Sequence, residues 1–217
     1  MPDHKRSYYL FAPKSLSESQ PMPLYVFLMG FDHLENPSKN TRNNYFKIAR
    51  AAEENNFLAV FPRGMPGSFP EIPGARAWYP EYFQENQRFL ASLTAWLCTK
   101  LPVNEKHIVM MGFSNGGYFG SIDALTNAKS PFTGFWLDGG SYPYAFNKQV
   151  EKKPIFISCG ENDYENRPHV EKFREFIQEN GWSEGVNLET FMHKSGHAFN
   201  NQSLTEGLKF FAGFFGT

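Results

Sequence analysis

Short runs of hydrophobic residues alternate along the chain with longer segments in which hydrophobic residues recur at helical spacing. The short runs are apolar on both faces, which is typical of strands in a parallel sheet covered by helices. Strands are predicted at residues 24–29, 57–61, 108–111, 132–137, 155–158 and 186–192. Helices are predicted at residues 44–55, 90–101, 114–126, 170–181 and 204–215. The pattern therefore indicates an α/β fold with a mostly parallel central sheet and helices on both faces.

Two further segments complete this picture. Residues 6–12 are expected to add an antiparallel edge strand, and residues 63–80, rich in glycine and proline, are expected to form a long loop. Neither a repeat nor an interdomain linker is visible, so residues 1–217 are predicted to form a single domain. In open α/β sheets, sites lie at the carboxyl ends of the strands, and candidate residues are sought there.

Composition and charge restrict the class of partner. The 217 residues are 41% hydrophobic and carry 21 Lys and Arg against 22 Asp and Glu, a formal net charge of −1. This balance argues against nucleic acid or an anionic membrane as the main partner, because both require a basic surface. No apolar run approaches the ~20 residues that span a bilayer, and no signal-peptide core is visible at the start.

The cysteine content bears on metal binding and location. The chain has two cysteines, Cys98 and Cys159, and they lack the spacing of metal ligands. A disulfide framework is therefore excluded and no metal site is expected. A reducing compartment suits such a chain, which predicts a cytoplasmic location.

The strongest chemical signal follows the strand at residues 108–111. The sequence there reads GFSNGG from Gly112 to Gly117, which places the pattern G-x-S-x-G between a strand and a helix. A nucleophile elbow needs this setting, because a serine on so tight a turn requires very small neighbours. The positive end of the helix also lies where an oxyanion would form. Ser114 is thus the candidate nucleophile, and the alternative is a glycine-rich turn with an incidental serine.

A serine nucleophile needs a histidine base, which is expected after the acid in the chain order. His197 lies in the sequence SGHAF, between the last predicted strand and the last predicted helix. Gly196 lets that loop turn back over Ser114, so His197 is the predicted base. His193, at the end of the strand itself, is the reserve candidate.

The acid that orients the base should lie one strand before the histidine loop. Asp163 occupies the loop that follows the strand at residues 155–158 and is the predicted acid. Two rivals remain open, Asp138 at the end of the preceding strand and Glu161, two residues from Asp163.

An oxyanion hole needs two backbone N–H donors. One is expected from Asn115, the residue after the nucleophile. The other is expected from Phe31, in the loop that follows the first parallel strand, where Gly30 supplies the turn.

These motifs resemble those of the α/β-hydrolases, most closely the compact phospholipase/carboxylesterase group and the feruloyl or polyhydroxybutyrate-depolymerase-like esterases. The resemblance covers the chain from Tyr8 onward, and its carriers are GFSNGG around Ser114, PIFISCGEND leading to Asp163, and SGHAF around His197. It implies the α/β-hydrolase fold, with these three residues as nucleophile, acid and base. The chain departs from the family at Met29, where a histidine commonly precedes the glycine.

Aromatic residues in two loops could contact a substrate. Trp78 and Tyr79 lie in the glycine- and proline-rich loop, and Tyr142 lies in the segment 139–150. We expect these three side chains to bind substrate, and the alternative is that they pack onto the body of the domain. The segment 139–150 is too short for a large cap, so an open site is expected.

The sequence as a whole predicts a serine hydrolase that cleaves a carboxylic ester or thioester of a small molecule, without a cofactor. The alternatives are a peptidase on the same fold, or a non-catalytic binding protein that retains it. Proteins of the second kind usually lose a triad residue, and none is missing here. The oligomeric state is left open.

Overall fold

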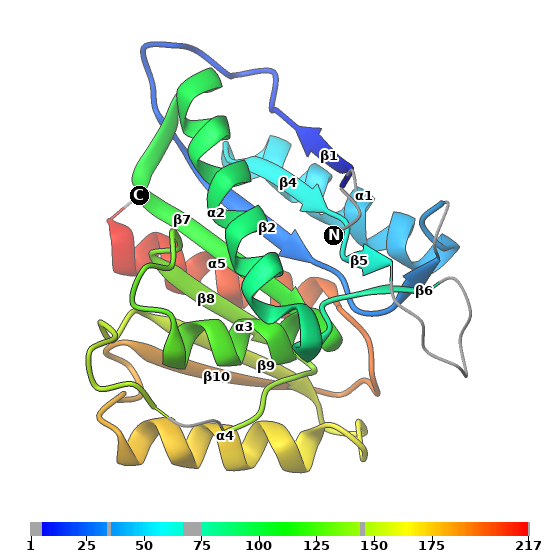
Figure 1. Ribbon diagram of the computed structural model, residues 1–217, viewed down its shortest axis with the longest axis vertical. Coiled ribbons are helices and arrows are strands. Elements are labelled where there is room, and N and C mark those ends of the chain that lie inside the picture. Colours follow the sequence, from blue (N-terminus) through cyan, green and yellow to red (C-terminus); the bar gives the residue numbers. More distant parts are fainter. Residues whose placement is uncertain (1–5, 34–35, 67–74, 144–145, 217) are drawn as a thin grey trace.

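The computed structural model describes residues 6–33, 36–66, 75–143 and 146–216. Within these residues the main element is a seven-stranded sheet in the order β1-β4-β2-β7-β8-β9-β10 (Figure 1). The strands are β1 (Tyr8–Phe11), β2 (Met22–Leu28), β4 (Leu58–Pro62), β7 (Val103–Phe113), β8 (Gly134–Asp138), β9 (Ile155–Gly160) and β10 (Leu188–His193). The pairing of β1 with β4 is antiparallel and the other pairings are parallel. The predicted mostly parallel sheet and its antiparallel edge strand are confirmed.

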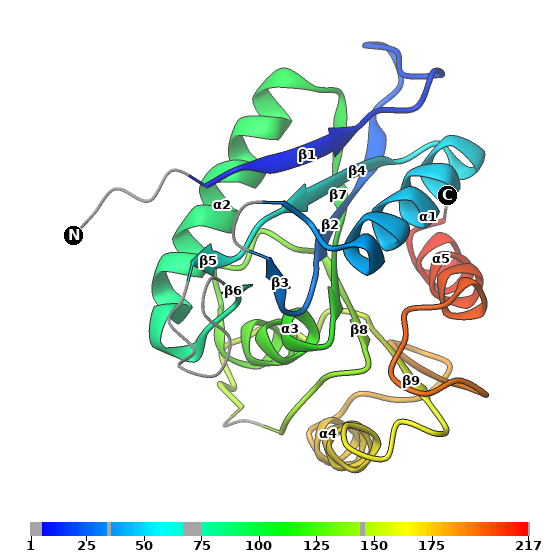
Figure 2. The same ribbon diagram turned by 90° about the vertical axis from the view of Figure 1, so that its right-hand side faces the viewer.

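Helices cover both faces of this sheet (Figure 2). On one face lie α1 (Lys39–Asn55) and α5 (Asn201–Phe215), and on the other lie α2 (Phe83–Lys100), α3 (Asn115–Thr126) and α4 (Arg167–Glu179). Successive side chains of a strand point to opposite faces, so Val26 joins one apolar core and Phe27 the other. Both cores consist of buried hydrophobic side chains, which explains why the strands read as continuous hydrophobic runs.

A second, smaller sheet occupies part of the segment predicted to be a long loop. It consists of β3 (Asp32–His33), β6 (Ala75–Ala77) and β5 (Met65–Pro66), with antiparallel pairing throughout. A short 3₁₀ helix, Pro80–Tyr82, follows β6. The loop prediction was wrong at residues 65–66 and 75–77, because strands this short show no periodicity. Residues 67–74 lie outside the described residues.

Helix α1 begins at Lys39 rather than at residue 44, where the helical spacing starts. Its N-cap is Ser38, whose Oγ accepts a hydrogen bond of 3.1 Å from the backbone N–H of Thr41. The first turns are polar and therefore lack the apolar spacing on which the sequence prediction depends. The added turns reach toward the loop that follows β2.

The segment after β8 contains no large cap. Residues 139–143 and 146–150, the described part of that segment, form neither a helix nor a strand. In the part of the chain that the structure describes, no helix has both the length and the apolarity that crossing a bilayer requires.

Candidate active site

Ser114 lies on a strained turn between β7 and α3. Its backbone has φ 55° and ψ −121°, a conformation that costs a non-glycine residue ~1–3 kcal/mol. The turn is as tight as the sequence predicts: a Cβ on Gly112 would collide with the carbonyl of Gly116, and one on Gly116 with the carbonyl of Leu28. The Ser114 N–H donates a 2.9 Å hydrogen bond to the carbonyl of Asp138. The neighbouring strand thus holds the turn in place.

The structure brings Ser114, His197 and Asp163 into direct contact, although they come from three separate loops. His197 Nε2 lies 2.9 Å from Ser114 Oγ, and His197 Nδ1 lies 2.6 Å from Asp163 Oδ2. A carboxylate can only accept, so Nδ1 carries the hydrogen and Nε2 presents its lone pair to the serine hydroxyl. This arrangement can remove the serine proton during attack on a carbonyl.

Asn166, which was not among the predicted site residues, donates hydrogen bonds to Asp163, the predicted acid. Its Nδ2 donates to Asp163 Oδ1 at 2.9 Å, and its backbone N–H donates to the same oxygen at 3.2 Å. The Tyr118 hydroxyl in turn donates to Asn166 Oδ1 at 3.0 Å, and burial raises the pKa of Tyr118 to about 12. The sequence offers only a weak signal for this role, an asparagine three residues after the acid and next to a helix start.

The rival acids and the reserve base occupy other places. Asp138 is buried at the end of β8, and burial raises the pKa of its carboxyl to about 8 despite the hydroxyls of Ser158 and Ser203 beside it. The side chain of Glu161 is exposed. His193 is buried, which lowers its pKa, and its Nδ1 accepts from the backbone of Ser195 at 3.4 Å. The hydrogen bond from His197 Nδ1 goes to Asp163.

The segments expected to supply the oxyanion donors Phe31 and Asn115 flank Ser114. A Cβ on Gly30 would lie 2.9 Å from the Ser114 Cβ, so the loop after β2 passes directly against the serine. Trp78 connects the two segments: its backbone N–H donates to Asn115 Oδ1 at 2.7 Å, and its indole N–H donates to the Met29 carbonyl at 3.0 Å. The donor role of the two backbone N–H groups stays a prediction.

The three aromatic side chains expected to bind substrate differ in exposure. Trp78 and Tyr79 are 2% and 5% exposed, and the ring of Trp78 packs against Phe119. Such side chains offer little surface to a ligand, and the contacts of Trp78 indicate that it supports the loops. Tyr142 is 47% exposed, with its ring 5.6 Å from that of His169. Its contact with a substrate stays a prediction.

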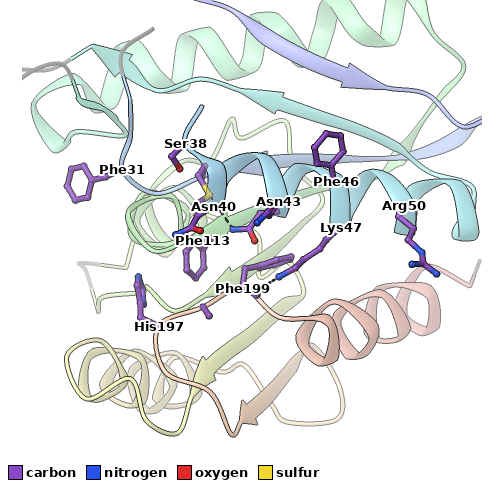
Figure 3. A pocket seen from close by; sticks show the side chains of 13 residues that line it. Phe31, Ser38, Asn40, Asn43, Phe46, Lys47, Arg50, Phe113, His197 and Phe199 are labelled. Atoms are coloured by element: carbon purple, nitrogen blue, oxygen red, sulfur yellow. Dashed lines mark hydrogen bonds between the residues drawn. The ribbon is translucent and has the colours of Figure 1, made fainter. Parts of the chain in front are cut away.

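A cleft of about 740 Å³ adjoins His197 on the side of α1 (Figure 3). It is lined by Met29, Phe31, Ser38, Asn40, Asn43, Asn44, Phe46, Lys47, Arg50, Phe113, His197, Ala198 and Phe199. Substrate was expected near the loops that carry Trp78, Tyr79 and Tyr142. That α1 lines a cleft beside the site was not predicted. The sequence signal that could have indicated this wall is a group of asparagines at positions 40, 43 and 44. The same pattern is also typical of a helix face exposed to solvent.

Metal binding has no support in the described parts of the chain, where no group of three or more His, Cys, Asp or Glu side chains is placed to hold an ion.

Comparison with known proteins identifies the fold. Neither a model of a protein family nor a curated protein sequence matches the chain. Among solved structures, esterase PE8 is similar with a TM-score of 0.73 and 15% identity, over 97% of this chain and 99% of that one. The carboxylesterase of Bacillus cereus gives a TM-score of 0.66 and 15% identity, over 98% and 96%. The S-formylglutathione hydrolase FrmB of Staphylococcus aureus gives 0.69 and 14%, over 95% and 90%.

These similarities extend over almost the full length of each chain. Together with the strand order and the serine turn after β7, they establish that this chain has the α/β-hydrolase fold. At 14–15% identity they carry the fold and not the reaction.

Proposed function

We propose that the protein is a serine hydrolase that cleaves a carboxylic ester or thioester of a small molecule. The observation that carries the proposal is the pair of hydrogen bonds that joins Ser114 Oγ to His197 and His197 to Asp163. The esterase names of proteins with the same fold support it. We also propose that the chain acts as one domain in the cytoplasm, without a metal or cofactor.

The proposed reaction begins when Ser114 Oγ attacks the carbonyl carbon and His197 Nε2 takes its proton. Asp163 keeps the imidazole in the required tautomer and stabilises the imidazolium that forms. The backbone N–H groups of Phe31 and Asn115 hold the oxyanion of the tetrahedral intermediate. His197 then protonates the leaving alcohol or thiol, and water releases the acyl group from Ser114 by the reverse sequence.

A covalent serine probe and a panel of substrates test the proposal. We expect a fluorophosphonate to label the wild-type protein and Ser114→Ala to abolish labelling. The same variant should lower kcat by ~10⁴ or more on whichever of the p-nitrophenyl esters, feruloyl esters or acyl-thioesters is cleaved. The matched control is Ser19→Ala, which removes an exposed serine far along the chain from the site.

Several outcomes would contradict the proposal. Labelling of Ser114→Ala at the wild-type rate would place the nucleophile elsewhere. A wild-type protein that neither labels nor cleaves any ester would favour the non-catalytic alternative. Faster cleavage of p-nitroanilides than of the corresponding esters would favour the peptidase alternative.

A further inference from the structure

One wall of the cleft beside His197 is a single face of α1. Asn40, Asn43, Lys47 and Arg50 recur at intervals of three and four residues, so they lie on the same side of the helix. Figure 3 shows Asn43 and Lys47 between α1 and the loop that carries His197. Seven residues separate Asn40 from Lys47, roughly 10 Å along the helix axis. The cleft therefore suits a compact molecule.

The charge of this cleft is positive. Among the described residues, the 13 that line it include two cations and no aspartate or glutamate. Arg50 is bound to Glu54 at 2.8 Å, with 82% of its side chain exposed, so its charge is both compensated and screened by solvent. Lys47 is half-buried, and no ion pair involves it among the described residues.

The ammonium group of Lys47 has hydrogens left for a ligand. Its Nζ donates to the carbonyl of Phe199 at 2.9 Å, which uses one of three N–H donors. Asp138 lies within electrostatic reach of Lys47, but burial raises the pKa of that carboxyl to about 8. The raised pKa favours the protonated, neutral form of Asp138, which compensates the lysine charge less than an ordinary carboxylate does.

Apolar surface completes the cleft. The rings of Phe31, Phe113 and Phe199 line it from the strand and loop side, opposite the polar face of α1. A bound molecule that is apolar along its skeleton and anionic at one end would match both walls. A half-buried cation attracts such an anion more strongly than an exposed one does.

We propose that this cleft binds one half of an ester whose carbon skeleton carries a carboxylate, and that Lys47 recognises that carboxylate. The inference rests on the proposed function and narrows its substrate class to compact anionic esters. The carboxylate belongs to whichever half of the ester occupies the cleft, since the acyl and alcohol halves meet at Ser114 and His197.

Lys47 also supports the loop that carries His197, because its Nζ donates to the carbonyl of Phe199, two residues after that histidine. A simple loss of activity in a lysine variant would therefore not separate ligand binding from loop support. The test must compare two substrates that differ only in the charge at one end.

Two substrate pairs provide that comparison. The first pair differs in charge on the acyl half: the p-nitrophenyl monoester of adipic acid is anionic, and the p-nitrophenyl ester of adipic acid monoamide is neutral. The second pair differs in charge on the alcohol half, as para-acetoxybenzoate and para-acetoxybenzamide. We expect at least one pair to show a preference for the anionic member, and Lys47→Met to lower that kcat/KM ratio about ten-fold, or ~1.4 kcal/mol.

Two variants serve as controls for this ratio. Lys47→Arg, which keeps the charge, should retain the preference. Lys39→Met removes a cation from the same helix outside the cleft lining, and the ratio should stay at its wild-type value. Equal losses on both members of each pair in Lys47→Met, or no anionic preference in the wild type, would overturn the proposal.

Binding without turnover separates this inference from the proposed reaction. In the Ser114→Ala background, calorimetry with para-hydroxybenzoate and para-hydroxybenzamide measures the preference of the cleft directly. Tighter binding of the acid that disappears in the Ser114→Ala, Lys47→Met double variant supports the inference even for a protein without esterase activity. Equal affinity for acid and amide overturns it for the alcohol half even in an active esterase, and the same comparison with adipamic acid and adipamide decides it for the acyl half.

Discussion

The imidazole of His197 stacks on the ring of Phe113, with the ring centroids 4.9 Å apart and the planes inclined by 24°. Phe113 is the residue before Ser114, at the end of β7, and its side chain is 6% exposed. The candidate base therefore packs on the strand that presents the candidate nucleophile. Its orientation depends on this stacking as well as on its hydrogen bond to Asp163.

Replacing the stacked ring tests this dependence. Phe113→Leu keeps an apolar side chain but removes the aromatic contact, which is worth ~0.5–1.5 kcal/mol. We expect kcat on an ester to fall several-fold, with little change in KM, because the imidazole samples more orientations. Steady-state kinetics measure the effect, and an unchanged kcat would show that Asp163 alone fixes the ring.

The acid is assigned by comparing two carboxylates. Asp163→Asn should lower kcat by ~10³–10⁴, because the amide favours the wrong imidazole tautomer, while stability changes little. Asp138→Asn should cost far less activity, since the hydrogen bond of His197 Nδ1 goes to Asp163 and burial favours the neutral form of the Asp138 carboxyl. Kinetics and urea unfolding on both variants decide the matter. A larger loss of kcat in Asp138→Asn would move the acid to the end of β8.

We expect Asn166, whose Nδ2 lies 2.9 Å from Asp163 Oδ1 and 3.2 Å from His197 Nδ1, to act as a positioning residue in the proposed reaction. Asn166→Ala removes the 2.9 Å hydrogen bond to Asp163 Oδ1, and we expect kcat to fall about ten-fold with KM nearly constant. Tyr118→Phe, which removes only the outer hydrogen bond, should have a smaller effect in the same direction. A change confined to KM or to stability would contradict the positioning role.

Position 30 requires a glycine because the backbone there passes directly against Ser114. Gly30→Ala would place a Cβ 2.9 Å from the Ser114 Cβ and 3.2 Å from its Oγ, so either the serine or the loop must shift. We expect at least a ten-fold loss of kcat/KM, since small displacements of reacting groups are costly. The control, Gly213→Ala in α5, meets no atom within 4 Å and should keep full activity. It should also raise stability by about 0.5–1 kcal/mol.

A buried histidine outside the site predicts how stability depends on pH. His107 is 2% exposed, contacts the Tyr25 hydroxyl at 3.2 Å and packs on Phe215, and burial lowers its pKa to about 4. Below pH ~6.5 the unfolded chain binds a proton that the folded chain does not. This histidine therefore destabilises the fold progressively as the pH falls from about 6.5 to 4.

His107→Gln isolates this contribution. Relative to the variant, the wild-type protein should lose roughly 2 kcal/mol of stability between pH 7 and pH 5. Urea unfolding at both pH values measures the difference, and Asp138 titrates in both proteins and so cancels. A stability difference that is independent of pH would show that His107 binds a proton as readily in the fold as in the unfolded chain.

Much of the fold was predictable because burial leaves a direct trace in the sequence. Strands such as β4, with every residue buried, read as unbroken hydrophobic runs, and α4 carries Val170, Phe173 and Ile177 at helical spacing. The turn at Ser114 was predictable for a steric reason, since glycines must stand where backbones touch. Ser114, Asp163 and His197 could be paired by chain order, although only the structure shows that they meet.

The parts that escaped prediction depend on contacts between distant segments. Trp78 was expected to face a substrate, yet its hydrogen bonds to Met29 and Asn115 place it between two loops, and no local pattern encodes that. The first turns of α1 are polar because they face the cleft, so they resemble a solvated segment. The side chain of Asn166 contacts Asp163 through its amide, and a single polar residue produces no periodic pattern in the sequence.

The contacts of the site close into a ring. They run from Ser114 to His197, Asp163, Asn166 and Tyr118, and the Tyr118 N–H returns to the Ser114 carbonyl at 3.0 Å, one turn along α3. In a closed ring each residue contacts two others. The position of each of the five residues is therefore fixed from two sides before a substrate binds. In the proposed reaction, the dipoles that would face a developing charge are therefore oriented in advance, which leaves little reorganisation energy to add to the barrier.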